Sequence, residues 1–334
     1  MSERPATHAG SWYSNEPSGI QSQLESYLNL TGRMSGPVPG ARIVISPHAG
    51  YRYCGRTMAY SYASLDLKST VRRIFVLGPS HHIYFKNQVL LSGFQSLETP
   101  LGSLQVDREV CQKLQQSPAG SLFGTMDAEA DMDEHSLEMQ FPMLVQALLW
   151  RGIPLDHVKV VPILVSHNST EVDWAIGRLL RSYFEDVENL FVISSDFCHW
   201  GRRFGYTGYV GSNEELQEAL KDETEIEMLT ARSKLSHHQV DVWQSIELLD
   251  RTAMQTLSSN DDSKRYQAWK SYLEVTSNTI CGARPIAVLL AMLAQLDGLE
   301  TNFEWPHYSQ SSHVKDLNDS SVSYASGFAT VHYG

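Results

Sequence analysis

The chain has 334 residues, of which 42% are hydrophobic and 19% charged, a composition that excludes a disordered or collagen-like protein. Its 26 Lys and Arg residues against 38 Asp and Glu residues give a formal net charge of -12, which argues against binding to nucleic acid or to an anionic membrane surface. The longest strongly apolar run, residues 286–293, is too short for membrane insertion, and residues 1–13 contain no export or import signal. We therefore expect a cytoplasmic protein, with the nucleus as a second compartment, whose four cysteines are reduced.

Short apolar runs alternate with longer amphipathic segments, and this alternation predicts an α/β fold with a mostly buried central sheet. We expect strands at residues 43–46, 74–77, 88–92, 158–165, 190–194, 321–324 and 328–332. We expect helices at residues 18–30, 107–115, 135–150, 170–184, 214–220, 240–256 and 285–296. Asp107 should cap its helix, Pro285 should lie in a first turn, and Pro142 should kink or divide the third helix.

The rest of the chain is expected to connect these elements. Residues 31–40 and 258–264 have the composition of loops. Since neither a repeat nor a long linker interrupts the pattern, we expect residues 1–334 to form one domain.

Side chains that bind metals or transfer protons follow three of the expected strands. No phosphate-binding loop, dinucleotide-binding glycine motif, serine-hydrolase elbow, H-E-x-x-H or C-x-x-C pair is present. Instead, His48 follows the first strand, His81 and His82 follow the second, and Asp196 and His199 follow the strand at 190–194. Because ligands bind beyond the carboxyl ends of parallel strands, we expect these side chains to converge on one crevice.

A metal site is the interpretation we favour for these groups. Adjacent side chains in an extended chain point to opposite sides, so we assign His81 to the site and treat His82 as its outward neighbour on the pocket wall. Judged from its neighbours in sequence, Cys281 is more readily interpreted as an inert buried thiol. However, the start of a helix and Arg284 lie nearby in the sequence, and both would stabilise its thiolate. Two imidazoles and a thiolate would suit copper, iron or zinc rather than magnesium or calcium.

Several further residues are candidates for the same pocket. Asp196 would fix the tautomer of His199, which would then act as a general acid or base or as a residue behind a ligand. His135, in the segment D-E-H-S-L-E, is a candidate for the pocket wall, although its acidic neighbours would also suit a helix start. Trp12 either lines the pocket or packs in the core, and Arg284 is assigned to the pocket rim.

Six motifs occur in an order that resembles the Memo family (mediator of ErbB-driven cell motility): H-A-G-S-W-Y, S-P-H-A-G-Y, G-P-S-H-H, E-H-S-L-E-M-Q, S-S-D-F-C-H-W-G and T-I-C-G-A-R-P-I. The resemblance covers almost the whole chain. It implies a single αβα domain similar to the class III, non-haem-iron extradiol dioxygenases of the LigB type. Residue by residue, it implies His48, His81 and Cys281 as metal ligands, with Asp196 and His199 as the remaining catalytic pocket residues.

The resemblance also implies a function. A cysteine at the position of the dioxygenase carboxylate argues against ring cleavage. The resemblance instead implies that the protein binds copper or iron, rather than zinc. It implies that this metal takes part in redox signalling linked to the cytoskeleton and to cell motility or growth form. Phosphotyrosine peptides are partners of the animal members.

Three functional hypotheses follow from these observations. The first is a metal-dependent oxidoreductase in which His199 transfers protons. The second is a non-catalytic adaptor that binds a signalling protein or phosphopeptide in a relict dioxygenase cleft, with Arg52, Arg56 and Arg284 as phosphate-binding side chains. The third is hydrolysis by a metal-activated water.

Overall fold

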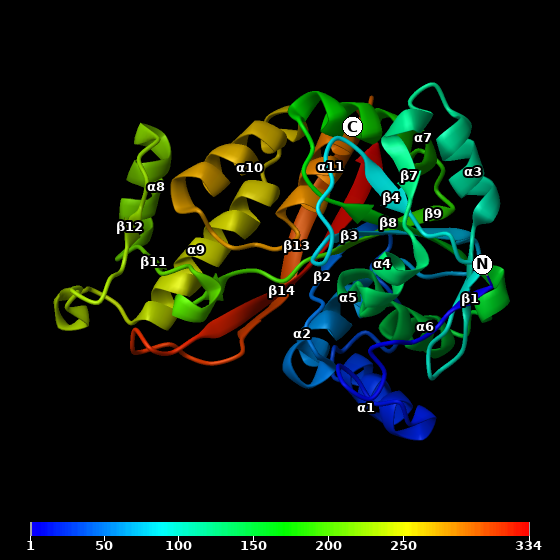
Figure 1. Cartoon of the computed structure of the whole chain (residues 1–334), viewed down its shortest axis with the longest axis horizontal. Coiled ribbons are helices and arrows are strands. Elements are labelled where there is room, and N and C mark those ends of the chain that lie inside the picture. Colours follow the sequence, from blue (N-terminus) through cyan, green and yellow to red (C-terminus); the bar gives the residue numbers. More distant parts are fainter. Residues whose placement is uncertain (1, 334) are drawn as a thin grey trace.

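A mixed β-sheet forms the centre of the computed structural model, which describes residues 2–333 (Figure 1). Its strands are β1 (Glu3–Arg4), β2 (Ala41–Ser46), β3 (Arg73–Pro79), β4 (Val89–Leu91), β5 (Ser96–Leu97), β6 (Leu104–Val106), β7 (Phe123–Thr125), β8 (Lys159–Val165), β9 (Asn189–Ser194), β10 (His199–Trp200), β13 (Leu299–Gln310) and β14 (Ser321–Tyr333). The main strand order is β1-β5-β6-β8-β3-β9-β2-β14-β10. Strands β11 (Gly208–Tyr209) and β12 (Glu227–Met228) form a separate ribbon.

Helices cover both faces of this sheet. They are α1 (Pro17–Asn29), α2 (Tyr51–Ser64), α3 (Arg108–Gln116), α4 (Ala128–Asp133), α5 (His135–Glu138), α6 (Gln140–Trp150), α7 (Thr170–Phe184), α8 (Asn213–Asp222), α9 (Val242–Leu257), α10 (Asp262–Thr276) and α11 (Ala283–Leu293). Helix α2 packs on β2 and β14 with α1 and α6 beside it, whereas α7 and α11 pack on β9 from the other side (Figure 1). The α/β prediction is therefore confirmed.

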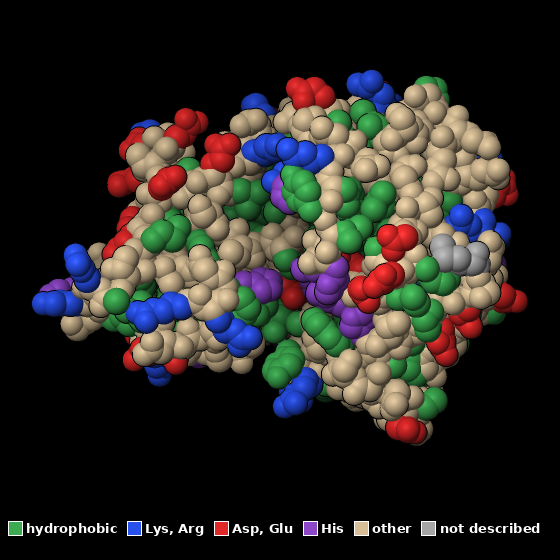
Figure 2. All heavy atoms as spheres, viewed as in Figure 1, with side chains coloured by type: hydrophobic (Ala, Val, Ile, Leu, Met, Phe, Trp, Pro, Cys, Tyr) green, Lys and Arg blue, Asp and Glu red, His purple; other side chains and the backbone are tan. Residues whose placement is uncertain are grey.

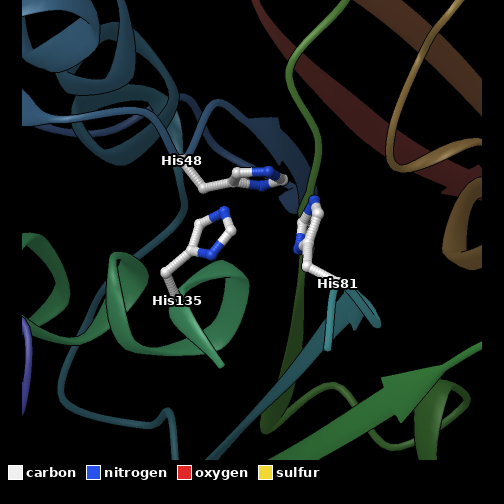
Figure 3. A group of neighbouring side chains, drawn as sticks. All are labelled: His48, His81 and His135. Carbon is white, nitrogen blue, oxygen red and sulfur yellow. The ribbon is translucent and has the colours of Figure 1, made fainter. Parts of the chain in front are cut away.

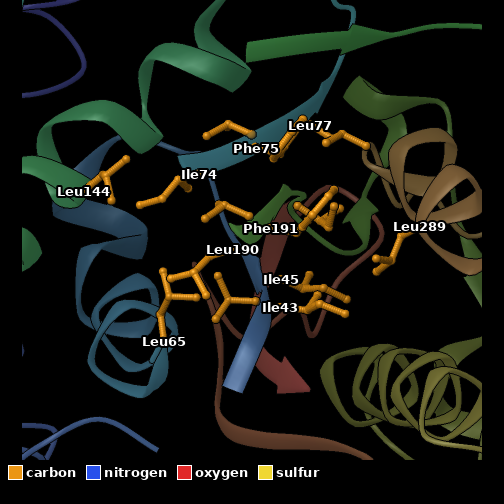
Figure 4. Close-up of a cluster of buried hydrophobic side chains, with 14 of the residues drawn as sticks. Ile43, Ile45, Leu65, Ile74, Phe75, Leu77, Leu144, Leu190, Phe191 and Leu289 are labelled. Carbon is orange, nitrogen blue, oxygen red and sulfur yellow. The ribbon is translucent and has the colours of Figure 1, made fainter. Parts of the chain in front are cut away.

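Three adjacent strands, β2, β3 and β9, are buried on both faces. Every residue of β2 and β9 is buried, as expected for parallel strands covered by helices. Figure 4 shows side chains of these strands between Leu65 and Leu144 on one side and Leu289 of α11 on the other. This two-sided packing holds the carboxyl ends of the three strands in fixed positions, and the candidate site residues follow those ends.

All the expected helices and strands are present, with shifted ends. Asp107 caps α3, because its carboxylate accepts a hydrogen bond from the Val110 N–H at 3.0 Å. The expected helix at 135–150 is divided into α5 and α6 next to Met139, three residues before Pro142. Pro285 lies in the first turn of α11, and the two late strands are one continuous strand, β14.

Other elements were not predicted, among them the helices α2, α4 and α10, the long strand β13 and the short strands β1, β5, β6, β7, β10, β11 and β12. Helix α2 is buried on more than one side, so its sequence lacks the one-sided apolar period that marks an amphipathic helix. The prediction of a loop at 258–264 is wrong from Asp262 onward, where α10 begins. Asp262 pairs with Arg265 at 2.7 Å within that first turn, and such acidic residues at a helix start resemble a loop in sequence.

The contact between α7 and α11 leads to a stability prediction. A Cβ at Gly177 would lie 2.7 Å from the backbone nitrogen of Met292. We expect Gly177→Ala to lower the free energy of unfolding by about 1–3 kcal/mol, because backbone atoms cannot move aside as a side chain can. Urea unfolding measures this change. The control is Gly36→Ala, where a Cβ has open space, and equal unfolding midpoints for the two variants would contradict the prediction.

Candidate metal centre

The candidate site lies at the carboxyl ends of β2, β9 and β3, which are parallel neighbours in the sheet. Ser46 pairs with Ser194 in register, and Leu77 pairs with Ile193. Residues that follow these strands therefore emerge at one edge, as the sequence predicted. Histidine side chains gather at the centre of the face seen in Figure 2, between hydrophobic and acidic side chains.

His48 is held in the tautomer that can bind a metal. Its Nδ1 lies 2.8 Å from Ser194 Oγ. Ser194 Oγ donates its single proton to the Ser136 carbonyl at 2.7 Å and accepts from Gln140 Nε2 at 2.9 Å, so it must accept from the Nδ1–H of His48. Burial, aided by the nearby charge of His81, lowers the pKa of His48 well below its usual value and keeps the ring neutral. The Nε2 lone pair is therefore free.

Loss of the Ser194 hydroxyl tests this account. In Ser194→Ala, the buried Nδ1–H of His48 loses its hydrogen-bond acceptor. We therefore expect the affinity for metal to fall by ~10–100-fold, which is the usual effect of removing a residue that orients a ligand. Competition with a chromophoric chelator measures the affinity. Ser182→Ala, a change on the exposed surface of α7, serves as the control. Unchanged affinity in Ser194→Ala would show that another group sets the tautomer.

His81 is held by Glu134, the residue before α5. The Nδ1 of His81 lies 3.0 Å from Glu134 Oε2, and its backbone N–H donates to Oε1 at 2.6 Å. Burial by itself would raise the pKa of Glu134, but the hydrogen bonds and charge of His81 and the N–H of Ser136 lower it to about 2. The carboxylate thus leaves His81 Nε2 free. From the sequence, the acids of this segment were predicted only to favour a helix start.

His135 and Trp12 lie beside these imidazoles. The ring of His135 stacks on His81 at a centroid distance of 4.2 Å and on Trp12 at 4.4 Å. It meets His48 edge-on at 5.4 Å, and Figure 3 shows the three imidazoles around a common space. Burial and the charges of His48 and His81 lower the pKa of His135 to about 3, so this ring is neutral as well. Both residues thus lie beside the imidazoles, and Trp12, 36% exposed, is not part of the core.

Cys281 reaches the same site from the segment before α11. Its Sγ lies 3.2 Å from His48 Nε2 and accepts the Asp196 N–H at 3.3 Å. Burial and the charge of Asp196 raise the pKa of the Cys281 thiol well above its usual value. The predicted stabilisation of the thiolate by Arg284 is therefore not found. A thiol in this place loses its proton when a cation binds to it.

Arg284 does not lie in this pocket. It is exposed in the first turn of α11 and lines a separate hollow of 290 Å³ along α10 and α11, together with Trp269 and Lys270. Its assignment to the rim of the site is corrected accordingly. The reason is helical geometry, because Arg284 stands on the outer face of a helix whose buried face packs on the sheet.

Among residues 2–333, three groups of side chains could hold a cation. In each, the ligand atoms lie within 4.8 Å of one another, and the groups are His48–His81–His135, His48–Asp196–Cys281 and His82–Glu134–His135. The expected ligands His48, His81 and Cys281 are split between the first two, which share His48. Imidazole and thiol donors fit copper, iron or zinc. The structure therefore supports a metal site around His48, whereas the choice of its other ligands stays a prediction.

Asp196 forms its hydrogen bond with His48 rather than with His199. Its Oδ1 accepts the His48 N–H at 2.8 Å, and its Oδ2 lies 3.8 Å from His48 Nε2. The Nδ1 of His199 lies instead 2.9 Å from the Phe197 carbonyl and 3.0 Å from that of Thr279. The prediction that Asp196 fixes the tautomer of His199 is wrong, because the carbonyls of Phe197 and Thr279 occupy the Nδ1–H of His199.

His199 is nevertheless suited to proton transfer. Since the backbone carbonyls accept from its Nδ1–H, its Nε2 carries a lone pair. Its ring meets Phe204 edge-on at 5.3 Å, and Phe204 lines a cavity of 520 Å³. Trp12 and Ala49, the residue after His48, line the same cavity. His199 therefore contacts a residue, Phe204, that lines a space which a small molecule can enter.

The cation of this cavity is Arg203, which the sequence analysis did not single out. Arg52 lies over the ring of Tyr53 at 5.2 Å and Arg56 over that of Tyr27 at 5.9 Å, so neither guanidinium is among the groups that line the cavity. The signal in the sequence was the G-R-R-F-G segment directly after the His199 motif.

Buried charges near the N-terminus position α5, and these too were missed. Arg4 is 2% exposed, pairs with Asp131 at 2.9 Å and donates to the carbonyl of Glu134 at 3.2 Å. His8, which showed no partner in the sequence, pairs with the fully buried Glu138. These contacts hold the segment that carries Glu134 and His135. The only sign of these contacts in the sequence was the spacing of acidic residues around His135. The partners of these acids, Arg4 and His8, lie more than a hundred residues away in the chain.

Comparison with known proteins decides the family. Residues 4–328 match the family model described as "Memo-like protein". The chain belongs to the Memo family. It is 61% identical over 340 residues to "MEMO1 family protein MHO1" of Saccharomyces cerevisiae, covering 99% of this chain and 100% of that one. It is 37% identical over 331 residues to "Protein MEMO1" of Homo sapiens, covering 98% of each. The expected family membership is thus confirmed.

One solved structure shares a partial likeness with this Memo-family chain. It is an uncharacterized protein, JW3007, from Escherichia coli K12, with 15% sequence identity and a TM-score of 0.36 over 75% of this chain and 84% of that one. Within residues 2–333, no helix combines the length and apolar character needed to span a membrane.

Proposed function

We propose that this Memo-family protein binds copper or iron through His48, His81 and Cys281 and uses the metal in a redox reaction. The observation that carries the proposal is the arrangement around His48. Its Nε2, which carries the lone pair, lies 3.2 Å from the Cys281 sulfur, and its ring centroid lies 5.3 Å from that of His81. Imidazole nitrogen and thiolate sulfur are the donors that hold copper and iron. The family resemblance favours these two metals over zinc.

The roles of the surrounding residues follow from their contacts. Ser194 and Glu134 would keep the Nε2 atoms of His48 and His81 available, and Asp196 would hold the backbone of His48 in place. A bound copper or iron ion would supply one-electron chemistry. The Nε2 of His199 would accept or donate a proton next to Phe204, which lines the cavity that would admit the co-substrate. We place this reaction, on the family resemblance, in signalling that controls the cytoskeleton and cell motility or growth form.

Metal analysis followed by an activity measurement tests the proposal. Protein purified without added metal should contain copper or iron, or take up about one equivalent of copper on titration, and should then consume oxygen in the presence of a reductant. His48→Ala should lose both properties, whereas Cys111→Ser, which changes a buried thiol on α3, should keep both. A parent protein that binds neither metal at micromolar concentration would refute the proposal.

A second candidate, an adaptor for phosphotyrosine peptides, is supported by the walls of the 520 Å³ cavity. Arg203 lies there among the aromatic rings of Trp12, Tyr53 and Phe204, a combination suited to a phosphorylated aromatic side chain. We expect Arg203→Ala to weaken binding of a phosphotyrosine peptide by ~10-fold or more, the loss of one charge-assisted contact. Arg284→Ala should have no effect in the same titration. Identical curves for Arg203→Ala and the parent would remove this candidate.

A further inference from the structure

His135 has unused ligand atoms on the outer side of the metal centre. Within residues 2–333, neither ring nitrogen of His135 makes a hydrogen bond to the protein, although its side chain is only 13% exposed. Its stacking on His81 and Trp12 covers the faces of the ring. The nitrogen lone pairs lie in the ring plane, so this stacking leaves them accessible. The ring nitrogens of His135 therefore have no protein partner that a cation would have to displace.

His82 and Glu134 are placed to share a ligand with His135. The ligand atoms of these three residues lie within 4.8 Å of one another. Glu134 Oε2 is 3.7 Å from His135 Nδ1, and the rings of His82 and His135 are nearly perpendicular at a centroid distance of 6.1 Å. His82 is exposed, and its ring likewise makes no hydrogen bond to residues 2–333. Two imidazoles and a carboxylate are the donors of many iron, zinc and cobalt sites.

Glu134 retains the capacity to bind a cation. Its Oε2 accepts from His81 Nδ1 and from the Ser136 N–H, both at 3.0 Å, whereas its Oε1 accepts only from the His81 N–H at 2.6 Å. A carboxylate offers about four acceptor positions, so one position on Oε1 remains. A cation there would not require the hydrogen bond that orients His81 to break.

We propose that His82, Glu134 and His135 form a second, outer cation site, separate from the inner site at His48 and Cys281. Because it lacks a thiol, the outer site takes divalent iron, zinc or cobalt in preference to monovalent copper. The side chain of His48 is 2% exposed and that of His135 is 13% exposed, and His82 lies at the surface. The side chain of His81 is 27% exposed, so a cation from solvent can reach both groups. The existence of this site does not depend on the proposed redox activity.

Titration of the metal-free full-length protein with Co²⁺ separates the two sites. A cobalt–thiolate bond adds an ultraviolet charge-transfer band, which a site made of imidazole and carboxylate lacks. We expect the parent to bind about two equivalents, only one of which contributes to that band. His82→Ala should bind about one equivalent with the band unchanged, whereas Cys281→Ser should bind about one equivalent without the band. His82 is exposed and packs in no core, so its removal leaves the fold intact.

The matched control is His332→Ala, which removes an exposed histidine near the end of β14 and should leave both equivalents bound. A parent that binds only the equivalent responsible for the band, or a His82→Ala variant that keeps both equivalents, would overturn the outer site. A second equivalent that depends on His82 in a protein that never develops the band would support the outer site and refute the proposed function instead.

Discussion

Cys281→Ser is expected to lower the affinity for copper by more than ~100-fold, a larger effect than the loss of a residue that only orients a ligand. Sulfur is the soft donor of the inner site, 3.2 Å from His48 Nε2, and a serine hydroxyl binds copper poorly. The fold should be retained, because serine is similar in size and its oxygen can also accept the Asp196 N–H that Cys281 now accepts. Copper titration and thermal unfolding of the two proteins measure both expectations.

Three other cysteines provide internal comparisons, since Cys54, Cys111 and Cys198 are buried and belong to none of the candidate metal groups. Among them Cys111→Ser is the cleanest control, because α3 is remote from the strand ends that carry the site. We expect it to leave copper affinity unchanged. If Cys281 reacts with a thiol reagent equally fast with and without copper, the sulfur is not a ligand.

His199→Ala is expected to reduce redox turnover by ~10²–10⁴-fold, the usual contribution of a general acid or base, while metal content stays the same. The reason is geometric. His199 belongs to none of the candidate metal groups, its Nδ1–H is held by the carbonyls of Phe197 and Thr279, and its Nε2 lone pair is left for the reaction. Oxygen consumption with a reductant gives the turnover, and elemental analysis gives the metal content.

The matched control is His238→Ala, which removes a histidine that pairs with Glu227 far from the metal centre. Turnover of that variant should equal that of the parent. A pH profile adds a further readout, because a proton-transfer residue changes the profile and a purely structural one does not. Loss of metal in His199→Ala would identify His199 as a ligand and exclude this role.

The fold class and the framework of the site were predictable from the sequence because they depend on local patterns. Two-sided apolar runs mark β2, β3 and β9 as central strands, and the residues after such strands meet at one edge whenever the strands are parallel neighbours. Helix α2 could not be predicted in this way, because its burial on several sides removes the apolar periodicity from its sequence. The start of α10 could not be predicted because its polar first turn has the composition of a loop.

The sequence by itself determined that His48 and His81 each follow a buried strand and that the motifs are those of the Memo family. Only the tertiary structure decided which side chains contact and orient the candidate ligands. Asp196 contacts His48 rather than His199, Glu134 holds His81, and Arg284 faces a different hollow. These pairings join residues far apart in the chain, and their directions depend on side-chain angles and on the packing of separate helices. No local pattern encodes such directions, because spacing along a chain specifies the face of an element but not the partner that packing brings to it.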